Sequence, residues 1–118
     1  MSGVLVTGAI LLPPRESLPE GAVAYVHLLD SSLADAPATV VSVQVIKNAG
    51  DKIEPDRKIK FALYGDIKNL NANYKVSVHI DLDGDGKLSV GDYTNVESYP
   101  VISYGYSTYV EVKMVKVK

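Results

Sequence analysis

The sequence has 118 residues, of which 47% are hydrophobic and 22% are charged, and its formal net charge is −2. This is an ordinary composition for a globular protein with its own hydrophobic core, so we expect a single domain over residues 1–118. The small negative charge provides no basic surface for nucleic acid. The absence of cysteine excludes disulfides, thiolate metal sites and a cysteine nucleophile.

The chain begins with an apolar stretch, residues 4–12, which is broken by Thr7 and Gly8 and ends at Pro13. The stretch is too short to span a bilayer, and it lacks the basic residues that precede the apolar part of a signal peptide. We therefore expect a strand here and no transmembrane segment. The expected location is the periplasm or cell surface if a leader has been removed ahead of this sequence, and otherwise the cytoplasm.

Hydrophobic residues recur along the chain with a period of two, which is typical of strands with one buried face. Strands are predicted over residues 4–12, 22–30, 39–46, 58–64, 74–80 and 107–118. In the third of these, Val41, Val43 and Val45 are expected to form the core row. In the last, the alternation slips at Met114 and Val115, where a β-bulge would restore it.

Clusters of Pro, Gly, Asp and Asn separate these runs and divide the chain into about seven to eight short strands. No segment has the pattern of a convincing amphipathic helix. The sequence therefore predicts an all-β fold, an antiparallel β-sandwich.

Residues 81–92, with the sequence DLDGDGKLSVGD, match the twelve-residue EF-hand calcium loop position by position. Carboxylates fall at alternate positions, and a glycine at the sixth position allows the chain to turn sharply. The predicted oxygen ligands of a Ca²⁺ ion come from Asp81, Asp83, Asp85, Ser89 and Asp92, and from the backbone carbonyl of Lys87. Because four aspartates so close together repel one another, a bound cation should stabilise the loop.

Two features separate this loop from that of a calcium sensor. Its last position is Asp92 instead of the longer glutamate, and it follows a strand instead of an amphipathic helix. We therefore expect a structural calcium site and not a switch, with a dissociation constant of roughly 10⁻⁴–10⁻³ M. The alternative is an acidic Asx-turn hairpin that binds no ion.

The two histidines, His27 and His79, have no second histidine or cysteine at ligand spacing. We expect both to be exposed strand residues. The alternative for His79, which lies two residues before Asp81, is a contact with the outer shell of the loop.

Five of the eight tyrosines fall within seventeen residues: Tyr93, Tyr99, Tyr104, Tyr106 and Tyr109. Such a cluster could stack sugars or bind a peptide, but strand tyrosines with their hydroxyl groups at the surface are commoner. No catalytic motif accompanies them, so an enzyme is not supported.

The block LDSSLADAP at residues 29–37 resembles the YbaY/YscW family, as do Val6-Thr7-Gly8 near the start and Ser98-Tyr99-Pro100-Val101 near the end. These are bacterial lipoproteins that include the lipoprotein chaperones, or pilotins, of type III secretion. The resemblance covers nearly the whole chain and implies an extracytoplasmic β-sandwich. For the secretion members it also implies binding of a hydrophobic segment of an outer-membrane secretin. This chain differs in having no lipobox cysteine and in carrying a full calcium loop.

These observations favour a non-enzymatic binding or chaperone-like module of the cell envelope, stabilised by one structural Ca²⁺ ion. Its expected partner is a protein segment of an envelope or secretion component, and it is expected to be a monomer or weak oligomer. Such a module should have an exposed apolar groove between the sheets or along an edge strand. The alternative is a carbohydrate-binding or adhesive surface module, which would need the five clustered tyrosines on one exposed platform.

Overall fold

The computed structural model describes residues 3–13, 18–31, 38–67, 71–82, 90–95, 97 and 99–117, which form nine strands and one short 3-10 helix. The strands are β1 (Gly3–Leu11), β2 (Val23–Asp30), β3 (Thr39–Ile46), β4 (Lys58–Gly65), β5 (Tyr74–Asp81), β6 (Tyr93–Thr94), β7 (Tyr99–Val101), β8 (Tyr109–Lys113) and β9 (Val115–Lys116). The helix, η1, is Ala49–Lys52. The all-β prediction is therefore confirmed.

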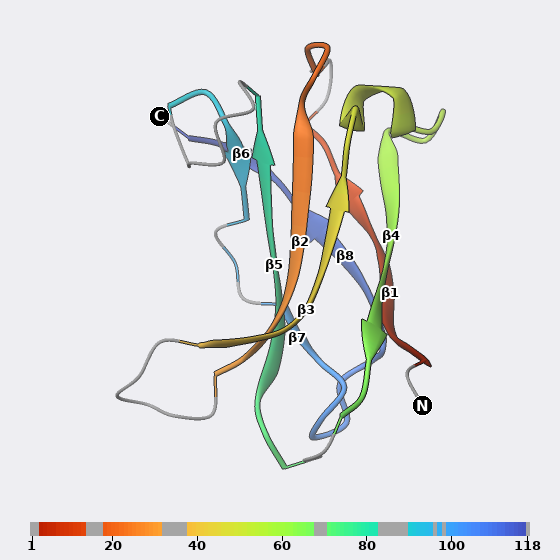
Figure 1. Ribbon diagram of the computed structural model, residues 1–118, viewed down its shortest axis with the longest axis vertical. Helices are drawn as coiled ribbons and strands as arrows, with labels where there is room; N and C mark the ends of the chain where they lie inside the picture. The colour runs from red at the N-terminus through yellow and green to blue at the C-terminus, as the bar shows by residue number, and fades with distance from the viewer. Residues whose placement is uncertain are drawn as a thin grey trace.

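The strands form two sheets that face each other as in a sandwich (Figure 1). The smaller sheet has the order β4-β1-β8, and the larger has the order β3-β2-β5-β6-β9, with β7 also paired to β5. The prediction of an antiparallel sandwich is wrong at one pair, because β1 and β8 run parallel from Thr7 and Tyr109 to Leu11 and Lys113. The other strand pairs are antiparallel.

The core lies between the two sheets and takes alternate residues from each long strand. The largest fully buried side chains are Val6 and Ile10 of β1, Val26 and Leu28 of β2, Ile59 and Leu63 of β4, Val76, Val78 and Ile80 of β5, Tyr93, Val101 and Met114. Full burial of one aliphatic side chain of this size stabilises the fold by about 1.5–3 kcal/mol. The period of two in the sequence therefore located the inner faces of β4 and β5 correctly.

The third strand has the predicted bounds, but its predicted core row is wrong. Val43 and Val45 are 51% and 47% exposed, and Val41 is only partly buried. Val43 and Val45 lie opposite His27 and Tyr25 of β2, on the outer face of the larger sheet.

Polar side chains of β3 explain this reversal. Ser42 Oγ donates a hydrogen bond to the carbonyl oxygen of Tyr64, and Gln44 Oε1 accepts one from the N–H of Ala62 at 2.9 Å. The carbonyl of Tyr64 and the N–H of Ala62 both belong to β4, an edge strand of the smaller sheet, which lies beside β3 in Figure 1. An unpaired main-chain group away from water costs about 1–3 kcal/mol, so polar residues are favoured on this face of β3.

The last predicted strand, residues 107–118, is two strands in different sheets. β8 pairs with β1 in the smaller sheet, whereas β9 pairs with β6 in the larger one. Met114 between them is buried, and its N–H donates to the carbonyl oxygen of Leu11 at 3.0 Å. The slip at Met114 and Val115 therefore marks a crossing between the sheets and not a bulge. Figure 1 shows β8 running obliquely behind the larger sheet toward the side of β6.

The close approach of β1 to its neighbours depends on Gly8, which lies opposite Phe61 of β4 and Val110 of β8. A Cβ atom on Gly8 would lie 2.0 Å from the carbonyl oxygen of Val110 and 2.6 Å from Cζ of Phe61. The carbonyl belongs to a strand paired to β1, so it cannot move away without breaking that pairing.

The substitution Gly8→Ala should therefore lower the free energy of unfolding by about 1–3 kcal/mol, the usual range for an overpacked core. Urea unfolding followed by circular dichroism measures this loss. Gly3→Ala is the matched control in the same strand, because a Cβ there meets no atom within 4 Å. Equal midpoints for the two variants would contradict the packing described for Gly8.

Candidate functional site

The predicted calcium loop connects the end of β5 to the start of β6. Its first and last residues, Asp81 and Asp92, are 0% and 2% exposed. The other four predicted ligands lie outside the described residues: Asp83, Asp85, Lys87 and Ser89. In the part of the chain that is described, no three histidine, aspartate or glutamate side chains are grouped closely enough to hold a metal ion.

The carboxylate of Asp92 joins the two ends of the loop. Its Oδ1 accepts a hydrogen bond from the N–H of Leu82 at 3.1 Å, and its Oδ2 lies 3.0 Å from Nε2 of His79. A carboxylate is also an oxygen ligand of the kind that Ca²⁺ prefers. Asp92 therefore fixes the base of the loop and has the chemistry to contribute a ligand as well.

The prediction of an exposed His79 is wrong, and the alternative, a contact with the shell of the loop, is correct. The His79 side chain is 19% exposed, and its ring stacks on Tyr25 with centroids 5.9 Å apart. His27 is also partly buried. Burial lowers the pKa of His27, and the nearby His79 lowers it further.

The loop is also hydrogen-bonded to the end of the chain. The N–H of Gly91 donates to the carbonyl oxygen of Val117 at 2.9 Å, and the N–H of Val117 donates to the backbone carbonyl of Asp92 at 2.7 Å. These bonds continue the pairing of β6 with β9, in which Tyr93 lies opposite Lys116. The position of β9 therefore depends on the end of the loop.

An apolar groove lies where the chain crosses between the sheets. It has a volume of about 630 Å³ and is lined by residues 11–13 at the end of β1 and by residues 113–116. Leu12 and Met114 are buried, whereas Leu11, Pro13 and Val115 are partly exposed. The groove has the apolar lining and the position between the sheets that a chaperone-like module requires.

The five clustered tyrosines do not form one exposed platform. Tyr93 belongs to the core, and Tyr99 is partly buried, with its hydroxyl oxygen accepting a hydrogen bond from the N–H of Lys113 at 2.9 Å. The remaining three are exposed: Tyr104, Tyr106 and Tyr109. The arrangement required by the carbohydrate-binding alternative is therefore absent.

The sequence of residues 1–114 matches the family model described as "Type III secretion system lipoprotein chaperone (YscW)". The chain belongs to the YscW family. This confirms the resemblance seen in the sequence, and it also confirms that the protein is not an enzyme, since the YscW family is one of chaperones. No curated protein sequence matches the chain.

A solved structure supports the same assignment to the YscW family. The chain is similar to an alternative pilotin from the type II secretion system of Vibrio cholerae, with 30% sequence identity and a TM-score of 0.81. The similarity covers 100% of this chain and 99% of that one. The likeness therefore includes both sheets and the crossing between them.

The groove residues were missed by the sequence analysis. The available signals were the doubled apolar residues Leu11-Leu12 and Met114-Val115, which break the period of two at both places. Read together, they mark two strand ends that expose apolar side chains to the same space. Their proximity depends on the parallel pairing of β1 with β8, which hydrophobic alternation does not reveal. Among the described residues, no helix is long and apolar enough to cross a membrane.

Proposed function

We propose that this protein is a pilotin-like chaperone that holds a hydrophobic segment of a secretion-system component, such as a secretin, in the groove between the end of β1 and β9. The observation that carries the proposal is the apolar groove at the sheet crossing, in a chain that matches a lipoprotein chaperone family over residues 1–114. The family description also supports a position in the periplasm, at the outer membrane.

The groove suits a segment of protein better than the other apolar surface of the molecule does. Its volume of about 630 Å³ falls within the range of about 300–1,000 Å³ that is usual for ligand sites. The exposed valines of β3, Val43 and Val45, lie on the outer face of a sheet, and neither of them lines the groove. A concave site removes more of a bound side chain from water, and each Å² of apolar surface buried contributes about 25 cal/mol.

The proposal includes one structural Ca²⁺ ion in the loop at residues 81–92. The match to the twelve-residue motif supports it, as does the position of Asp81 and Asp92 at the two ends of the loop, between β5 and β6. Carboxylate oxygens are ligands that Ca²⁺ prefers. The cation would offset the repulsion among the four aspartates and would brace Asp92, whose neighbour Gly91 bonds to Val117 beyond β9.

Calcium should raise the melting temperature of the protein relative to EDTA. If calcium stands at ten times its dissociation constant, linkage stabilises the fold by about 1.4 kcal/mol, which corresponds to roughly 5 °C for a domain of this size. Differential scanning calorimetry in calcium, magnesium and EDTA measures the shift. The shift should disappear in Asp83→Ala, whereas equal melting temperatures in calcium and EDTA for the unaltered protein would refute the calcium site.

A charge placed in the groove should prevent binding of the secretion component. Val115→Asp puts a carboxylate on the wall formed by β9. Pro13→Glu puts a carboxylate on the opposite wall of the groove, at a position that follows the end of β1. Each variant is co-expressed with the secretin of the same genome, and the assembled secretin is recovered from outer membranes. Its amount should fall at least about tenfold, because loss of a buried apolar contact worth about 1.4 kcal/mol weakens binding by that factor.

Val43→Asp is the control for this experiment, because Val43 is an exposed valine remote from the groove lining. Melting curves establish that each variant is folded before its effect is interpreted. Normal secretin assembly in both folded groove variants would refute the proposed function.

A further inference from the structure

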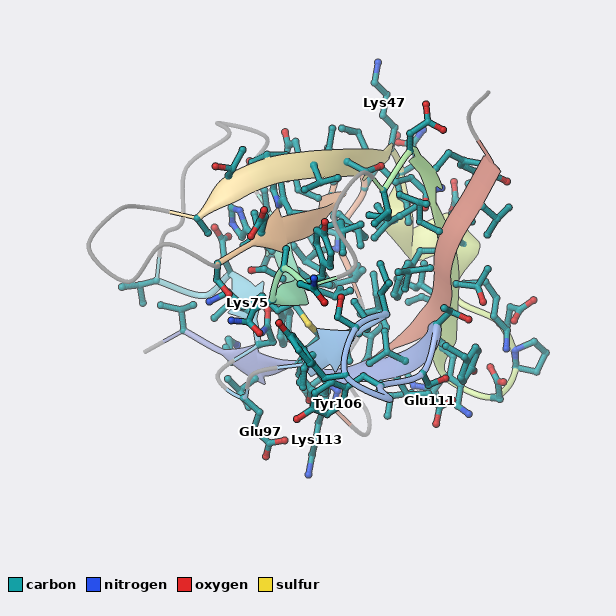
Figure 2. The ribbon with its side chains drawn as sticks, turned by 90° about the horizontal axis from the view of Figure 1, so that it is seen from below. Lys47, Lys75, Glu97, Tyr106, Glu111 and Lys113 are labelled. Atoms are coloured by element: carbon teal, nitrogen blue, oxygen red, sulfur yellow. The ribbon has the colours of Figure 1, made fainter. Side chains whose placement is uncertain are left out.

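Two lysines stand at the rim of the apolar groove. Lys113 and Lys116 flank the buried Met114, and both are exposed. The position of Lys113 is fixed by its backbone N–H, which donates to the hydroxyl of Tyr99, and that of Lys116 by its pairing with Tyr93. Figure 2 shows Lys113 projecting away from the body of the protein.

These lysines differ from those of β4, the opposite edge strand of the smaller sheet. Lys58 donates to Glu111 at 2.7 Å, a hydrogen bond that raises the pKa of the lysine and lowers that of the glutamate. Lys60 lies 3.8 Å from Glu54 and 4.0 Å from Asp56.

Within the described ranges the rim lysines have no such partners. Among the described residues, no carboxylate lies within 4.0 Å of the ammonium group of Lys113 or Lys116, although Glu97 points to the same side as Lys113 in Figure 2. The protein as a whole carries a net charge of −2, so attraction of an acidic ligand to the groove would come from these two lysines and not from the total charge. An apolar floor with two cations beside it is complementary to an apolar ligand that carries negative charge.

On the basis of the proposed chaperone function, we infer that the groove accepts an amphipathic segment whose apolar side chains are flanked by acidic residues. The apolar ridge of the segment would lie against Leu12, Met114 and Val115, and its carboxylates would approach Lys113 and Lys116 beside a surface of low polarity. Ion pairs in such a position are stronger than in open water. A basic flank would place like charges together, so the rim would select against basic segments.

The inference is tested with three labelled peptides of about 18 residues that share leucines spaced three and four apart. They differ only in having Glu, Gln or Lys at the flanking positions, and their dissociation constants are measured by fluorescence anisotropy. The Glu peptide should bind about tenfold more tightly than the Lys peptide, because it can form two partly exposed ion pairs with the rim lysines. This difference in affinity should shrink in 0.5 M salt, where the Debye length is only about 4 Å.

The preference should reverse in Lys113→Glu/Lys116→Glu. The matched control is Lys47→Glu/Lys75→Glu, which makes the same change in net charge away from the groove and should preserve the preference for the Glu peptide. A preference that changes equally in both double variants would overturn the inference, because it would reflect total charge and not the rim.

The remaining outcomes separate this inference from the proposed function. Equal binding of all three peptides, lost in Val115→Asp, would overturn the acidic preference and leave the groove as a site for apolar segments. Binding by none of them would overturn both. Two further results would overturn the inference by identifying another occupant. One is binding to phosphatidylglycerol vesicles that Val115→Asp abolishes, and the other is a dimer in sedimentation that the same substitution dissociates.

Discussion

The crossing of the chain at Met114 connects the two sheets and determines where the groove lies. Within one residue the chain leaves the smaller sheet, where β8 pairs with β1, and enters the larger one, where β9 pairs with β6. The buried Met114 side chain and the hydrogen bond from its N–H to Leu11 hold the two sheets together at this side. Side chains of Ser42 and Gln44 connect them at the other side, between β3 and β4. The groove lies at the crossing, because β1 and β9 belong to different sheets there and leave apolar side chains between them.

The loop between β5 and β6 acts on the same region. Asp92 is bonded to Leu82 and His79 at the base of the loop, and its backbone carbonyl accepts the hydrogen bond from Val117 beyond β9. β9 has only two residues, and among the described strands it pairs with β6 alone, so these bonds form a large share of what holds it. An ion bound in the loop would therefore stabilise one wall of the groove as well as the loop itself. Such an ion would brace a binding surface and would not act as a switch.

Local patterns were sufficient to predict most strands. Thr39–Ile46 has the predicted bounds, and the alternation in β5 placed Val76, Val78 and Ile80 in the core. The strands that were missed, β6 and β7, have two and three residues, too few to show a period. The inner face of β3 was assigned wrongly because Ser42 and Gln44 bind main-chain groups of a strand distant in sequence, and a hydrophobic pattern contains no information about that strand.

The candidate site was predictable only where its chemistry is local. The twelve-residue motif indicates a calcium loop from spacing alone, and this remains a prediction because residues 83–89 lie outside the described ranges. The contact of His79 with Asp92 arises because β6 folds back on β5, and the groove arises because residues 11–13 meet residues 113–116. Contacts between residues about a hundred positions apart are set by sheet topology, which no short pattern specifies.

We propose that the groove at the sheet crossing receives the partner segment. This proposal is tested most directly by nuclear magnetic resonance of the ¹⁵N-labelled protein, titrated with the hydrophobic segment of the secretin from the same genome. We expect the largest chemical-shift changes at the amides of the residues that line the groove: Leu11, Leu12, Met114, Val115 and Lys116. Changes centred on Val43 and Val45 of the outer face, or on Tyr104, Tyr106 and Tyr109, with the groove amides unchanged, would contradict it.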